Sequence, residues 1–199
     1  PLNDTTLPSG LRKLTFGALF DQPLDHIHLP SGLQHLQFNG RWNNHLDFVG
    51  TPVRLKTLAF GTGFNIGMEF ADLPNGLRRL ALGDAFNQSL DHTELPSGLQ
   101  TLTFVWIFDQ PLDDATLPSG LQNLIFGRNF NQSLERTSLP TGLLNLTFGE
   151  KFNQSIGVWT LPSGLQNLTF RENFKQRLDM VALPDGLQNL TSGDVVVPS

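Results

Sequence analysis

A leucine–proline pair recurs along this chain every 22 residues, and this fixed spacing constrains the fold more than any other feature. The leucines that open the units are Leu7, Leu29, Leu73, Leu95, Leu117, Leu139, Leu161 and Leu183, and Thr51–Pro52 occupies the one missing place. A period in this range is typical of chains that stack one coil on the next. We therefore predict a stack of coils that presents a surface, with no central cleft.

The unit boundaries predict the domain organisation. We expect one repeat domain over residues 1–199, with about nine coils that start at residues 7, 29, 51, 73, 95, 117, 139, 161 and 183. Pro1–Leu2 corresponds to a late part of a preceding unit, so the chain starts in mid-repeat without a polar cap. Because an uncapped coil exposes core and an open strand edge, we expect a longer array or a covering partner at this end.

Composition excludes several classes of function. The formal net charge is −5 and no basic run exceeds two residues, which disfavours binding to nucleic acid phosphates. The chain has no cysteine, so it has no disulfide framework, no thiolate nucleophile and no thiolate-bound metal. No apolar stretch is long enough to span a membrane. The missing cysteines favour an intracellular, cytoplasmic location, and an organelle is the alternative because the chain begins with Pro1.

The apolar pattern within each unit predicts short strands. Counting from the opening residue, positions five and eight are always leucine, position ten is usually phenylalanine, position fourteen is phenylalanine or Trp42, and position eighteen is aliphatic or Met68. Positions eight and ten are apolar around a polar residue, which indicates a strand with one buried face. Pro-Ser-Gly before it suits a type I turn with proline at the second corner. We predict a β-rich solenoid with a parallel β-ladder and little or no α-helix.

The units resemble a known family. The segment from Leu121 to Leu134, Leu-Gln-Asn-Leu-Ile-Phe-Gly-Arg-Asn-Phe-Asn-Gln-Ser-Leu, closely resembles the 22-residue FNIP repeat, a relative of leucine-rich repeats. The match covers essentially the whole chain. The resemblance implies a curved, right-handed, leucine-rich-repeat-like solenoid that binds other proteins. It implies no catalytic residues and no cofactor.

Position fifteen is nearly always Asn or Asp, and this row allows two interpretations. Its members are Asp21, Asn43, Asn65, Asn87, Asp109, Asn131 and Asn153, followed by Lys175. These side chains pair readily with backbone groups, so we favour a ladder that satisfies the turn of the neighbouring coil. The alternative is a row that binds a ligand.

The fifth unit carries three adjacent apolar residues, Val105, Trp106 and Ile107, where other units have glycine and two polar residues. Three neighbours on one short segment cannot all face inward. Some of this apolar area is expected to be exposed, and exposed apolar patches suggest protein contacts. The alternative is a locally repacked loop.

Positions six, seven and nine are expected to flank or lie on the open face of the strands. In the first four units they include five basic side chains, Arg12, Lys13, Lys56, Arg78 and Arg79. In the last five units they are mainly Thr, Asn and Gln. The basic end could attract an acidic partner, or it could be an ordinary solvated surface. The Thr and Asn rows raise a further alternative, a flat ladder that binds ice or a glycan lattice.

Catalytic and metal sites are not indicated. The pair His26 and His28 lacks further ligands at defined spacing, so we predict no metal site. Position nineteen is usually Asp or Glu, but one carboxylate per coil is too few for calcium, which favours a solubilising strip over a calcium row.

The sequence thus predicts a non-catalytic scaffold for protein–protein interaction. Its candidate surfaces are the concave strand face and the loop patch around Trp106. The alternatives are a structural subunit of a larger assembly, bound through its edges or loops, and the lattice-binding ladder. We expect a protein partner, no nucleic acid and no membrane insertion.

Overall fold

The computed structural model describes residues 7–24, 27–45, 54–68, 73–156, 161–179 and 181–193. The predictions made for Pro1–Leu2, for Thr51–Pro52 and for His26 lie outside these residues.

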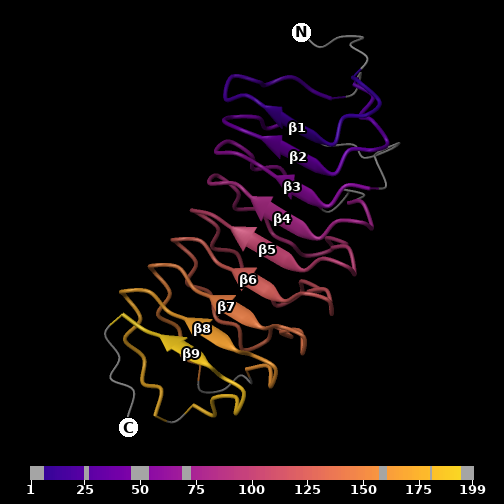
Figure 1. The fold of residues 1–199 in the computed structure, drawn as a ribbon. Coiled ribbons are helices and arrows are strands. Elements are labelled where there is room, and N and C mark those ends of the chain that lie inside the picture. Colours follow the sequence, from indigo (N-terminus) through magenta and orange to yellow (C-terminus); the bar gives the residue numbers. More distant parts are fainter. Residues whose placement is uncertain are drawn as a thin grey trace.

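Nine short strands lie side by side in one sheet across the described residues (Figure 1). They are β1 (Lys13–Phe16), β2 (His35–Phe38), β3 (Thr57–Ala59), β4 (Arg79–Leu82), β5 (Thr101–Phe104), β6 (Asn123–Ile125), β7 (Asn145–Thr147), β8 (Asn167–Thr169) and β9 (Asn189–Thr191). The strands follow chain order, and every neighbouring pair is parallel. Each strand begins at position seven of its unit, so residues 22 apart in sequence pair with each other, as Lys13 does with His35.

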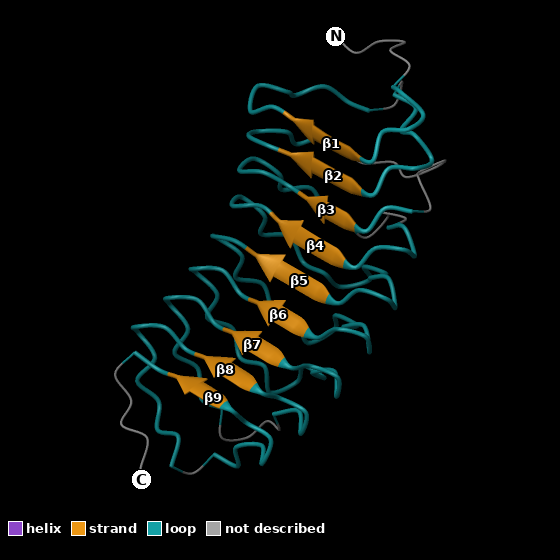
Figure 2. Ribbon diagram, viewed as in Figure 1, coloured by secondary structure: helices purple, strands orange, loops and turns teal. Residues whose placement is uncertain are grey.

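This architecture confirms the predicted fold class. The chain is a β-solenoid with a parallel ladder, and its described segments contain strands, turns and loops but no helix (Figure 2). The same residues accordingly include no helix long and apolar enough to cross a membrane.

Hydrogen bonds between coils extend beyond the strands. The carbonyl of position six accepts from two backbone amides of the next unit, as Arg12 O does from Gln34 N at 2.8 Å and from His35 N at 3.0 Å. The contact recurs along the stack, for example from Leu144 O to the amides of Gln166 and Asn167. Because each coil satisfies backbone groups of its neighbour, no coil is complete without the next.

The turn before each strand differs from the prediction by one residue. Leu11 N donates to Pro8 O at 3.0 Å, and the equivalent bond recurs in later units, for example from Leu99 N to Pro96 O at 2.9 Å. Proline is therefore the first residue of the turn, Ser and Gly are its two central residues, and the predicted placement of proline at the second corner is wrong. In this arrangement the proline supplies only its carbonyl, so its missing amide hydrogen is not needed.

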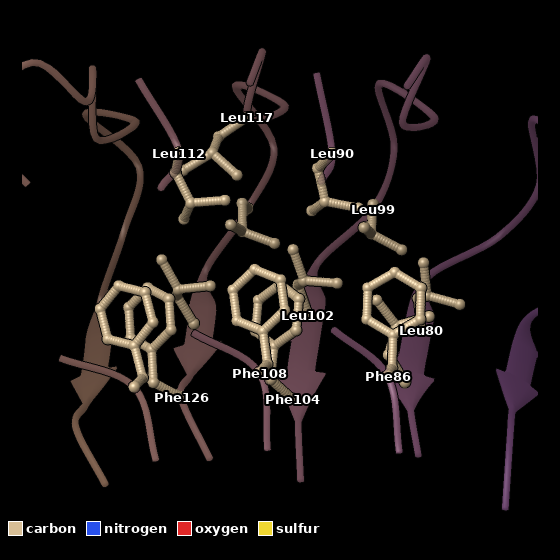
Figure 3. Close-up of a cluster of buried hydrophobic side chains, with 14 of the residues drawn as sticks. Leu80, Phe86, Leu90, Leu99, Leu102, Phe104, Phe108, Leu112, Leu117 and Phe126 are labelled. Atoms are coloured by element: carbon tan, nitrogen blue, oxygen red, sulfur yellow. The ribbon is translucent and has the colours of Figure 1, made fainter. Parts of the chain in front are cut away.

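The core is a stack of leucine and phenylalanine side chains inside the coils (Figure 3). Within one coil the rings at positions ten and fourteen stack face to face, as Phe104 does on Phe108 with ring centroids 3.8 Å apart. The same rings contact their equivalents in the next coil, as Phe108 contacts Phe130 at 6.0 Å. The aromatic residues therefore form two adjacent columns. Leu82 interrupts the column at position ten, and there Phe86 contacts Phe104 with ring centroids 6.5 Å apart, so the core stays continuous from coil to coil.

Spacing within the core shows which side of the stack is concave. Paired strands lie about 4.8 Å apart. Ring centroids of neighbouring coils are 5.2–5.8 Å apart at position ten and 5.9–6.1 Å apart at position fourteen. The coils thus spread apart with distance from the sheet, so the strands lie on the inner, concave side.

Glycine after the strand is required by close approach between coils. An added Cβ at Gly83 would lie 1.7 Å from the carbonyl oxygen of Gly61, and one at Gly149 would lie 1.7 Å from that of Gly127. These contacts explain why most units keep a glycine here, and they make Val105, at the same position of the fifth unit, an exception.

Candidate interaction surface

The row at position fifteen is a structural ladder. In coil after coil the side-chain oxygen of this residue accepts the backbone amide of its equivalent in the next unit, at 2.8–2.9 Å. The donors and acceptors are Asn65 N to Asn43 Oδ1, Asn87 N to Asn65 Oδ1, Asp109 N to Asn87 Oδ1, Asn131 N to Asp109 Oδ1, Asn153 N to Asn131 Oδ1 and Lys175 N to Asn153 Oδ1. Asn and Asp alternate freely because only an oxygen is needed. The favoured interpretation, a ladder that satisfies the turn of the neighbouring coil, is confirmed, since these oxygens accept backbone amides of the next unit.

A second amide ladder crosses the open face of the last strands, at position seven. The Nδ2 groups of Asn145, Asn167 and Asn189 each donate to the Oδ1 of the asparagine in the preceding strand, at 2.6, 2.5 and 2.6 Å. The row ends at β5, where Asn123 Nδ2 lies 3.3 Å from Thr101 Oγ1. The sequence predicted only a neutral surface here, whereas the structure shows side chains that bond to one another.

The basic side chains of the first four units occupy two neighbouring rows. Lys13 and Arg79 project from β1 and β4, and Arg12, Lys56 and Arg78 lie one residue before the strands. All five are exposed. The ion pairs among described residues are Arg128 with Glu150 and Arg177 with Asp179, so none of these five has an acidic partner among those residues. Their charge is available to another molecule.

One basic residue of this region was not predicted from the sequence. Arg54 replaces the turn glycine of the third unit and lines a groove together with Arg12 and Gln34. An arginine in place of the turn glycine was the feature of the sequence that could have indicated this residue.

The apolar residues of the fifth unit project into solvent. Val105, Trp106 and Ile107 are 42%, 47% and 36% exposed. Their loop remains in step with its neighbours, because Ile107 N donates to Asp84 O at 3.1 Å and Asn129 N donates to Trp106 O at 2.9 Å. The exposure of these side chains was predicted, and the structure shows that it occurs without a break in the regular backbone hydrogen bonding of the loop. Leu19, which is 99% exposed at the same position as Ile107 in the first unit, was not predicted.

Trp106 belongs to a short row of interacting side chains at position twelve. The guanidinium carbon of Arg128 lies 5.0 Å from the centroid of the Trp106 ring, and Arg128 Nε lies 2.8 Å from Glu150 Oε2. These residues come from three successive units. Stacking of the cation on the indole restricts the ring, which makes the patch a partly ordered apolar surface with a charged border.

Titratable side chains do not gather into a chemical site in the part of the chain that is described. It contains no group of three or more His, Cys, Asp or Glu residues that could hold a metal ion. Among the described residues, the hydrogen bond and the charge of Asp179 raise the pKa of the exposed Arg177 guanidinium. This local pair lies in the acidic row at position nineteen and does not involve the two candidate surfaces.

These features define a class of protein: a leucine-rich-repeat-like solenoid with a concave strand face, bordered by a basic row and an apolar loop patch. A family model described as FNIP Repeat matches residues 1–41, 64–105, 108–151 and 152–193. The chain therefore belongs to the FNIP repeat family, as its repeat unit predicted.

Solved structures support the same class. The chain is similar to CroV588, described as a novel circular LRR protein, with 30% sequence identity and a TM-score of 0.68 over 93% of this chain and 37% of that one. An internalin, InlF from Listeria monocytogenes, shares 13% identity with a TM-score of 0.55, over 92% of this chain and 61% of that one, which shows the fold alone. This chain thus spans less than two thirds of either protein. No curated protein matches it.

Proposed function

We propose that this chain is a non-catalytic scaffold that binds a protein partner through its concave strand face and the apolar patch formed by Val105, Trp106 and Ile107. The whole chain acts as one repeat domain in this proposal. An intracellular location is part of it and rests on the cysteine-free sequence.

One observation carries the proposal. Trp106 and its two neighbours are exposed at positions where most other units have glycine or polar residues, although the backbone around them is regular. A regular coil has no structural use for an exposed tryptophan, and burying such a ring against a partner contributes strongly to binding. Repeat solenoids typically bind other molecules through variable side chains on a constant frame.

The experiment compares three variants of the full chain as bait for affinity capture from native extract. The first is Trp106→Ala with Ile107→Ser, the second is Lys13→Ala with Arg79→Ala, and the matched control is Thr147→Ala with Thr169→Ala. We expect a specific partner that the control retains and that the patch or strand-face variant loses. A partner retained by the first two variants would instead indicate a structural subunit bound through edges or other loops. Loss only in the threonine control would indicate the lattice-binding ladder.

A further inference from the structure

The turn edge of the first three units carries a groove that the scaffold proposal does not use. Its volume is about 490 Å³, and it is lined by the Ser9–Gly10 and Ser31–Gly32 turns together with Arg12, Gln34 and Arg54. It lies beside the amino ends of β1 and β2, away from Trp106, which follows the carboxyl end of β5.

Room remains between the turns of the first two units, and Gly10 belongs to the first coil that the structure describes, so no described turn precedes it. An added Cβ at Gly10 would meet no atom within 4 Å, and one at Gly32 would find Ser9 O at 3.6 Å. The equivalent Cβ at Gly120 would lie 2.8 Å from Ser97 O. At Gly98 the space is already filled, because Nη1 of Arg78 would lie 2.3 Å from such a Cβ. An equally open turn recurs at Gly186, where an added Cβ would lie 3.7 Å from Ser163 O. The two arginines that line the groove therefore distinguish the first units, and Arg78 lies beyond the far end of the groove.

The polar groups that line the groove are suited to an anion. Arg12 and Arg54 supply guanidinium groups, Ser9 and Ser31 supply hydroxyls, and Gln34 supplies an amide. Guanidinium groups form the strong, directional hydrogen bonds that carboxylates accept. Neither arginine forms an ion pair with another described residue.

Charge is segregated around this edge. Positions three to ten of the first four units contain six of the thirteen Lys and Arg residues of the chain and no Asp or Glu, although the net charge is −5. The six are Arg12, Lys13, Arg54, Lys56, Arg78 and Arg79. A concentrated positive field on an acidic protein selects an acidic partner and orients it.

Resting on the scaffold role proposed above, we infer that this edge binds an extended acidic segment of the partner protein. One carboxylate of this segment contacts Arg12 and Arg54 in the groove, and a second contacts Lys56 and Arg78 along the stack. Arg12 and Arg78 are three coil spacings apart, about 14 Å, and about four residues of extended peptide cover that distance. Alternate side chains of such a peptide point to one face, so a segment with acidic residues at every second position suits the edge.

The test measures binding of fluorescein-labelled peptides of about eight residues to the full chain by fluorescence anisotropy. Glu alternates with Gly in the probe, and Gln replaces Glu in its neutral counterpart. The groove variant is Arg12→Glu with Arg54→Glu. The control, Arg136→Glu with Arg171→Glu, changes two exposed arginines elsewhere and makes the same change in net charge. Thermal unfolding of each variant verifies that the fold is kept.

We expect the acidic probe to bind at least about tenfold more tightly than the neutral one, and the groove variant to lose about tenfold or more while the control keeps its affinity. Added salt should weaken binding. Equal affinity for the two peptides, or equal loss in both variants, would overturn the inference. Tighter binding of a thymidine oligonucleotide of equal length, lost in the groove variant, would overturn it in favour of a phosphate ligand. The capture experiment above tests the scaffold proposal separately, because its variants leave Arg12 and Arg54 unchanged. Failure of this inference can therefore be distinguished from failure of the scaffold proposal.

Discussion

The two halves of the concave face share one backbone but use their side chains in opposite ways. From β6 to β9, position seven is always asparagine, and each amide bonds to the next. From β1 to β4 the same position holds Lys13, His35, Thr57 and Arg79, which differ in size and charge. The repeated asparagines of one half therefore bond to one another. Among the described residues, the varied side chains at position seven of the other half form no such row of hydrogen bonds.

The difference shows how to separate structure from recognition in a repeat protein. A residue type that recurs in the same row can satisfy its equivalent in the next coil, because the two lie about 4.8 Å apart. A charged residue cannot do so, since like charges on neighbouring coils repel. Lys56 and Arg78, at position six of neighbouring coils, therefore cannot pair in this way, and in the proposed function they contact a partner.

The largest expected effect should be the same in both halves, because the core is common to them. Phe60 stacks on Phe64 and Phe148 stacks on Phe152, each pair with centroids 3.8 Å apart. We expect Phe60→Ala and Phe148→Ala each to lower the free energy of unfolding by about 3–5 kcal/mol. Urea denaturation followed by circular dichroism measures this change. A much smaller loss for Phe60→Ala would show that the basic half is not packed as part of the same stack.

A smaller effect should follow from breaking the corner ladder at position fifteen. Asn131 Oδ1 accepts the amide of Asn153 at 2.8 Å, so Asn131→Ala leaves a backbone donor without its partner. The expected cost is about 1–3 kcal/mol in the free energy of unfolding. Asn131→Asp is the matched control, because Asp109 already accepts the amide of Asn131 in the preceding coil. If both substitutions cost the same, the ladder oxygen would not be the stabilising group.

Sequence alone predicted the architecture and the corner ladder, for a physical reason. Parallel stacking places residues 22 apart against one another, so a periodic sequence specifies its own contacts. The exposure of Trp106 was predictable for the same reason, as a departure from that period. The amide ladder on the open face was not predicted, because Asn and Thr suit both a solvated surface and mutual hydrogen bonds.

The groove was not predicted either. It is lined by side chains and turns of three different units, which only the stacking of the coils brings together. Arg54 was not among the predicted residues, and its place beside Arg12 is a result of the fold. The predicted turn was displaced by one residue because Pro-Ser-Gly can place proline at either the first or the second corner of a turn. The hydrogen bond from the amide of position five to the proline carbonyl shows that proline is at the first corner.

The most direct test of the central claim compares the stability of two triple variants, one of the asparagine row at position seven and one of the basic row beside it at position six. One is Asn123→Ala with Asn145→Ala and Asn167→Ala, and the other is Arg12→Gln with Lys56→Gln and Arg78→Gln. The measurement is the urea midpoint of each variant against the unchanged chain. We expect the asparagine variant to lose stability, at about 0.5–1.5 kcal/mol for each hydrogen bond removed, and the basic variant to keep or slightly raise its midpoint because like charges are removed. A basic variant that lost as much stability as the asparagine variant would contradict the claim, because it would show that the basic side chains hold the coils together.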